Sequence, residues 1–61
     1  MKYVIVIGEW LTDRPTKFIP INTIAAAYTL LRSRGYQSTQ RRNYLENSSK
    51  QLWARIVLAS T

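Results

Sequence analysis

The sequence predicts a small α+β domain: a mainly antiparallel sheet of three or four strands with one helix packed on one face, in the order β-β-α-β-β. Three patterns indicate this fold class. Apolar side chains recur at helical spacing between Ile24 and Leu31, they alternate with other residues from Leu52 to Leu58, and a β-branched run fills residues 3–7. The 61 residues form a single domain, 1–61, which buries only about 60% of the surface that its unfolded chain would expose.

The helix is expected from about Asn22 to Arg34. Side chains three or four residues apart share one helix face, and those that would pack on the sheet are Ile24, Ala27, Tyr28 and Leu31. Asn22 or Thr23 can cap the first turn, because a short polar side chain accepts a hydrogen bond from a free amide there. Gly35 suits the left-handed position that follows the last turn.

The residues beside the core face of this helix are also informative. Tyr36, directly after Gly35, would pack back on Leu31 as in a Schellman motif. Leu30 and Ala26 fall on the far side of the helix from Ile24 and Leu31. Leu30 is therefore either an ordinary exposed leucine of a very small domain or a contact with a partner or second subunit.

Two strands are expected before the helix. The run Tyr3–Ile7 places large apolar groups on both faces of a strand, so Val4 and Val6 must meet something other than the helix. Gly8 indicates a bulge or a strand end, and residues 12–16 indicate a turn. Lys17–Ile21 predicts a short strand that its proline confines to an edge of the sheet.

The second half of the chain has one clear strand. Leu52, Ala54, Ile56 and Leu58 alternate with Trp53, Arg55 and Val57, which directs the leucine series to the core and the others to the opposite face. Residues 36–45 show little apolar pattern, so they are either a solvated loop or an exposed, weakly registered strand. Residues 47–49 are turn formers.

The charge of the chain is its strongest functional signal. Nine Lys and Arg against three acids give a formal net charge of +6, of which residues 32–61 carry +5. Such an excess attracts polyanions, so nucleic acid is the leading partner class, DNA ahead of RNA, with an acidic protein surface as the alternative. Cysteine is absent, which favours the cytoplasm or another reducing compartment, and no apolar run is long enough to span a membrane.

The candidate nucleic-acid contacts combine arginine and lysine with tyrosine, asparagine and glutamine. Arginine pairs with phosphates or guanine, Asn and Gln pair with adenine, and tyrosine stacks on bases. The residues are Arg34, Tyr36, Gln40, Arg41, Arg42, Asn43, Tyr44, Lys50 and Arg55. We expect them to converge on one electropositive area and to serve a small, regulatory type of DNA-binding protein. The alternative for residues 34–44 is a solvated basic loop.

A second hypothesis makes the chain an interaction module that docks onto another protein and inhibits or redirects it. Its apolar anchors, which would equally serve a homodimer, are Val4, Val6, Leu30 and Trp53. The alternative for Trp53 is that its ring covers the sheet or stacks with Arg55 as an intramolecular cation–π pair.

Enzymatic function is not expected. The chain has no His and no Cys, which removes the commonest general base, the commonest soft nucleophile and the usual transition-metal ligands. Two glycines cannot build a phosphate-binding loop of the P-loop type. We therefore expect no catalytic residues, no metal and no cofactor.

Overall fold

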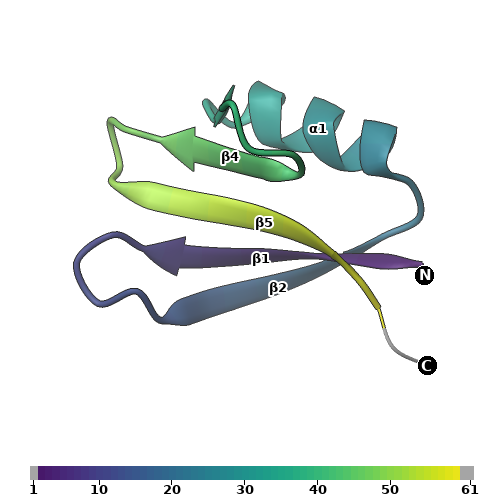
Figure 1. The fold of residues 1–61 in the computed structure, drawn as a ribbon, viewed down its shortest axis with the longest axis horizontal. Helices are drawn as coiled ribbons and strands as arrows, with labels where there is room; N and C mark the ends of the chain where they lie inside the picture. Colours follow the sequence, from purple (N-terminus) through teal and green to yellow (C-terminus); the bar gives the residue numbers. More distant parts are fainter. Residues whose placement is uncertain (1, 60–61) are drawn as a thin grey trace.

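A five-stranded antiparallel sheet carries one helix in the computed structural model, which describes residues 2–59 (Figure 1). In chain order the elements are β1 (Tyr3–Glu9), β2 (Pro15–Ile21), α1 (Ile24–Ser33), β3 (Gln37–Ser38), β4 (Tyr44–Asn47) and β5 (Leu52–Leu58). The strands lie in the order β2-β1-β5-β4-β3, so the first and last long strands are paired in the middle of the sheet.

The α+β class, the single helix and the antiparallel sheet are confirmed, but the strand number was too low. The expected three or four strands become five because residues 36–45 form a two-residue strand, a loop and the start of β4. β3 pairs with β4 through Gln37 opposite Glu46 and Ser38 opposite Leu45. Without an apolar alternation, backbone pairing alone defines so short a strand, and the sequence gives no periodic signal for it.

Both ends of α1 are capped as the sequence predicts. Thr23 is the N-cap, and its Oγ1 accepts a hydrogen bond of 3.0 Å from the amide of Ala26. Gly35 has a φ of 92°, its amide donates to the carbonyl of Arg32, and the amide of Tyr36 donates to the carbonyl of Leu31. These two bonds define a Schellman motif, which ends the helix and turns the chain back toward the sheet.

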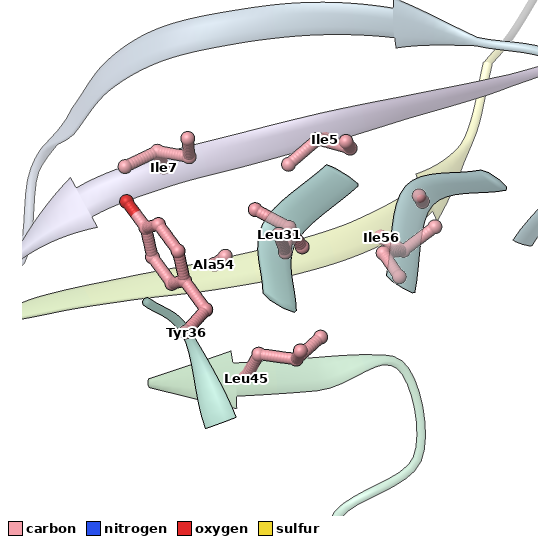
Figure 2. Packing of buried hydrophobic residues seen from close by; sticks show 8 residues of the cluster. Ile5, Ile7, Leu31, Tyr36, Leu45, Ala54 and Ile56 are labelled. Atoms are coloured by element: carbon pink, nitrogen blue, oxygen red, sulfur yellow. The ribbon is translucent and has the colours of Figure 1, made fainter. Parts of the chain in front are cut away.

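The core lies between α1 and one face of the sheet (Figure 2). Its buried members are Ile5, Ile7, Ala27, Leu31, Tyr36, Leu45, Ala54 and Ile56. Leu31 is completely buried and points into the centre of this cluster, as Figure 2 shows. The helix face predicted from the sequence and the inward direction of Ala54 and Ile56 are therefore confirmed, whereas Leu58 is 74% exposed at the end of β5.

Leu30 differs from the prediction. It is half-buried and packs against the core cluster, so it does not lie off the core as expected, while its role as a contact with a partner stays a prediction. The reason is geometric: a helix resting on a sheet buries a stripe at least about 100° wide, and consecutive residues differ by about that angle. Leu30, next to Leu31, therefore lies at the flank of the buried stripe.

The chain's second strand and the bulge are also where the sequence places them. β2 is an edge strand, beginning two residues earlier than expected at Pro15. The register between β1 and β2 shifts between Ile7 and Gly8, which is the irregularity that Gly8 indicated.

Truncation of Leu31 tests the core. Leu31→Ala is expected to lower the free energy of unfolding by about 2–5 kcal/mol, because a completely buried leucine leaves a cavity that one helix cannot close. Urea denaturation followed by circular dichroism measures the change. The matched control is Leu11→Ala, at a side chain that is 91% exposed, with an expected change within about 0.5 kcal/mol. Equal effects of the two substitutions would contradict the core described here.

Candidate functional site

The face of the sheet that α1 does not cover carries a row of side chains across four strands. We call this surface the open face. Strand register aligns Phe18 of β2 with Val6 of β1, Val6 with Arg55 of β5, and Arg55 with Tyr44 of β4. With strands about 4.8 Å apart, the row is about 14 Å long. Apolar, aromatic and cationic groups thus lie side by side on one face of the sheet.

Phe18 and Arg55 are the exposed members of this row. Phe18 is 64% exposed, so its apolar side chain faces solvent on the open face. Val6 is half-buried between them. The expectation that Val4 and Val6 face away from the helix is confirmed by the register, since Val4 pairs with Pro20 and Val57 on the same face. Their role in an interface stays a prediction.

Trp53 occupies the neighbouring row, opposite Gly8, and it is buried. Only 6% of the residue is exposed, because the indole lies across Gly8 where any other side chain would stand. A Cβ added to Gly8 would come within 2.5 Å of Trp53 Cε2 and within 2.7 Å of the Arg14 carbonyl oxygen. The proposed use of Trp53 as an interface anchor is therefore wrong: the ring fills a gap in the sheet's own surface.

The guanidinium group of Arg55 lies 5.3 Å from the centre of the Trp53 ring. This is the intramolecular cation–π pair that was the alternative interpretation of these two residues. The indole N–H of Trp53 is buried and has no hydrogen-bond partner among residues 2–59. The pair holds the Arg55 charge over the sheet while leaving the residue exposed.

Tyr44 forms a second arginine–aromatic pair. The guanidinium carbon of Arg41 lies 4.8 Å from the centre of the Tyr44 ring, and the Tyr44 hydroxyl donates a hydrogen bond of 3.2 Å to Glu46 Oε2. Burial raises the pKa of Tyr44, as do the charge of Glu46 and this hydrogen bond, while Arg41 and Arg55 partly lower it. The phenol therefore stays protonated near neutral pH and binds the carboxylate that lies on the open face.

The other residues predicted in this segment lie in the β3–β4 connection. Gln40 and Arg42 are exposed beside Arg41. Asn43 has a positive φ of 58°, its amide donates to the Tyr28 hydroxyl at 3.0 Å, and its carbonyl accepts from the amide of Ile56. The backbone of Asn43 thus ties the connection to the helix and to β5, which fixes the loop that carries Arg41.

Arg34, Tyr36 and Lys50 lie elsewhere. They line a hollow on the helix side of the sheet together with Lys17. The Tyr36 ring is 6% exposed within the core, so it cannot stack on a base as predicted. The expected single electropositive area is wrong as well: strand alternation directs Arg55 to the open face, whereas the end of α1 carries Arg34 to the other side.

One residue of the open face and one of the hollow on the helix side were not among the predicted site residues. Phe18 and Lys17 lie in the predicted strand 17–21, where alternation directs them to opposite faces. Counting the parity of that strand from Ile19 and Ile21, which pack on the core, would have assigned Lys17 to the helix side and Phe18 to the open face.

Neither a cluster of metal ligands nor a membrane-spanning helix occurs among residues 2–59. No three His, Cys, Asp or Glu residues gather there as ligands for a metal ion. The helix α1 is too short and too little apolar to cross a membrane.

Comparison with models of known protein families, with curated protein sequences and with solved structures found no match. The site is therefore interpreted from its own chemistry.

The packing of Trp53 on Gly8 is testable by substitution. Gly8→Ala should displace the indole and lower the free energy of unfolding by about 1–3 kcal/mol, the usual effect of overpacking. In a Trp10→Phe background Trp53 is the sole tryptophan, so its emission should shift to longer wavelength as water reaches the ring. Unchanged emission and stability would show that the indole does not lie over Gly8.

Proposed function

We propose that this protein binds nucleic acid through the open face, with DNA as the first candidate and a single strand as the preferred form. The observation that carries the proposal is the cross-strand row Phe18, Val6, Arg55 and Tyr44, with Arg41 stacked on the tyrosine. It combines an exposed ring with two guanidinium groups on an uncovered sheet. Proteins that bind single strands use aromatic side chains for bases and cations for the backbone in this way.

The width of the sheet favours a single strand over a duplex. Five strands span about 19 Å between the outermost axes. The major groove of B-DNA is about 12 Å wide and admits a helix or a two-stranded ribbon. A five-stranded sheet cannot enter that groove face-on, but it can support unpaired bases laid along its surface.

The positive charges of the open face also support the binding of nucleic acid there. Two arginines lie beside Tyr44: Arg41 is stacked on its ring, and Arg55 is its cross-strand partner on β5. The carboxylate of Glu46 accepts a hydrogen bond from the Tyr44 hydroxyl and is outnumbered by these arginines. Exposed Arg42 and Gln40 extend the surface beyond Arg41. A backbone crossing the row would therefore meet cations along its path.

Removal of the two stacked arginines tests the electrostatic part. Arg41→Gln with Arg55→Gln lowers the net charge from +6 to +4. The slope of log K against log salt for a single-stranded DNA oligonucleotide should become shallower by about 1.4, which corresponds to two lost phosphate contacts. Fluorescence anisotropy at several salt concentrations measures the slope.

The control for this experiment removes the same charge from the other side of the sheet. Lys17→Gln with Lys50→Gln also gives +4 and should leave the slope for an oligonucleotide with a 5′-hydroxyl end nearly unchanged. Equal slopes for both double variants would refute a role for the open face, because binding would then follow net charge alone.

Stacking on Phe18 is a separate prediction. Phe18→Ala removes an exposed ring and should leave the fold intact, yet weaken single-stranded DNA binding by about 5- to 140-fold, corresponding to about 1–3 kcal/mol per stacked base. Gel shifts with single-stranded DNA, duplex DNA and RNA rank the three substrates. Loss of affinity for duplex and single strand alike, with no preference for the single strand, would contradict the stacking role.

A protein partner is the second candidate, favoured by a different observation. The β1–β2 connection exposes 91% of Leu11 and 42% of Trp10, which form an apolar tip apart from the row of cations. Docking of another protein's apolar surface on this tip would inhibit or redirect that protein. A pull-down separates the two functions: one stoichiometric protein retained after nuclease treatment favours docking, and nucleic acid released at moderate salt favours the open face.

A further inference from the structure

The helix leaves one end of the sheet uncovered on its own side. Ten helical residues span about 15 Å, whereas the seven-residue strands β1, β2 and β5 span about 23 Å. Beyond the Schellman turn a hollow of about 230 Å³ opens above Ile7 and Leu52. Its polar lining consists of Thr16, Lys17, Arg34, Tyr36, Asn47 and Lys50.

Three cations from three separate segments meet at this hollow. Lys17 comes from β2, Arg34 from the C-cap of α1, and Lys50 from the turn between β4 and β5. None of the described residues that line the hollow is a carboxylate. Like charges that line one hollow repel each other, so an anion bound among them removes an unfavourable interaction.

Asn47 fixes two of these segments around the hollow. It is 2% exposed, and its Nδ2 donates a hydrogen bond of 3.3 Å to the carbonyl of Arg34. Its Oδ1 accepts bonds from the amide of Lys50 at 3.2 Å and from Ser49 Oγ at 2.9 Å. One buried amide thus connects the helix end to the β4–β5 turn and holds the backbone segments that carry Arg34 and Lys50 on either side of the hollow.

The Tyr36 hydroxyl supplies a neutral donor. Figure 2 shows the ring against Ala54 with its oxygen at the Ile7 end, away from the centre of the core. Within the described residues no hydrogen bond is formed by this hydroxyl, whereas that of Thr16 donates to the Ile7 carbonyl at 3.2 Å. Burial raises the pKa of Tyr36, and the nearby Arg34 charge lowers it in part. The phenol is therefore protonated near neutral pH and free to donate.

We infer that this hollow binds a phosphate group, held by the charges of Lys17, Arg34 and Lys50 and by a hydrogen bond from the Tyr36 hydroxyl. The inference goes beyond the nucleic-acid function of the open face, because the hollow lies on the other side of the sheet. Three cations favour a dianion over a single carboxylate. The volume, below the 300–1,000 Å³ or so of pockets for drug-sized molecules, holds a phosphate with some water but no large ligand.

Titration of the full chain with inorganic phosphate tests the site. In ¹H–¹⁵N NMR spectra at constant ionic strength, phosphate should shift the amides of Lys17, Tyr36 and Lys50 and the side-chain amide of Asn47, whereas chloride should not. Binding should tighten as pH rises from 5 to 8, because inorganic phosphate loses its second proton near neutral pH and becomes the dianion that three cations favour. A phosphate effect equal to that of chloride would overturn the proposal.

Matched variants assign the interaction. Lys17→Gln with Lys50→Gln should weaken phosphate binding by at least about tenfold, and Tyr36→Phe, which keeps the buried ring, by about three- to tenfold. Arg41→Gln with Arg55→Gln loses the same charge on the open face and should stay within about twofold. Equal weakening by the two double variants would show that no defined site exists.

The source of the phosphate is separated by two further ligands. Single-stranded DNA with a 5′-phosphate binding more tightly than the same strand with a 5′-hydroxyl, in a manner lost in the Lys17/Lys50 variant, identifies a nucleic-acid end. If a mononucleotide binds more tightly than inorganic phosphate, while the 5′-phosphate and 5′-hydroxyl strands bind equally, the natural ligand is a small metabolite. The 5′-hydroxyl strand reports on the open face alone, so failure of the proposed function and failure of this inference give different results.

Discussion

The whole molecule depends on one mismatch of size: a single ten-residue helix must cover one face of a five-stranded sheet. Leu31, completely buried at the centre of the core, is the side chain through which the helix makes this contact. The Schellman turn at Gly35 ends the helix and returns the chain to β3. Everything that the helix cannot reach stays open, and both candidate sites are such uncovered surfaces.

On the open face, arginine side chains partly cover the aromatic rings. Trp53 packs on Gly8, and Arg55 lies over the Trp53 ring. Arg41 lies in the same way over Tyr44 of the neighbouring strand β4. Each pair shields part of an aromatic ring while its charge remains available, since the stems of long cationic side chains cover apolar surface and keep their heads in water. A sheet without a second layer thereby becomes a cationic, partly aromatic surface.

Much of the fold was predictable from the sequence because local signals agreed. Helical spacing, a threonine cap and a glycine stop defined α1, and alternation defined β5 and its inward face. β3 was not predictable, since two polar residues carry no period. The site was predictable only in residue type. Tyr36 belongs to the core because it lies beside Ile7, and Trp53 belongs to the sheet surface because it packs on Gly8; both partners are remote in sequence. The division of the cations between the two faces follows from strand register.

The most direct test is to map where a single-stranded DNA oligonucleotide with a 5′-hydroxyl end lies on the ¹⁵N-labelled protein. Binding on the open face predicts that the perturbed amides and side chains cluster at Val6, Phe18, Tyr44 and Arg55, with the outward side of α1 unaffected. Perturbations centred on α1 or on the apolar tip at Leu11, with that row unchanged, would contradict the assignment of the open face as the binding surface.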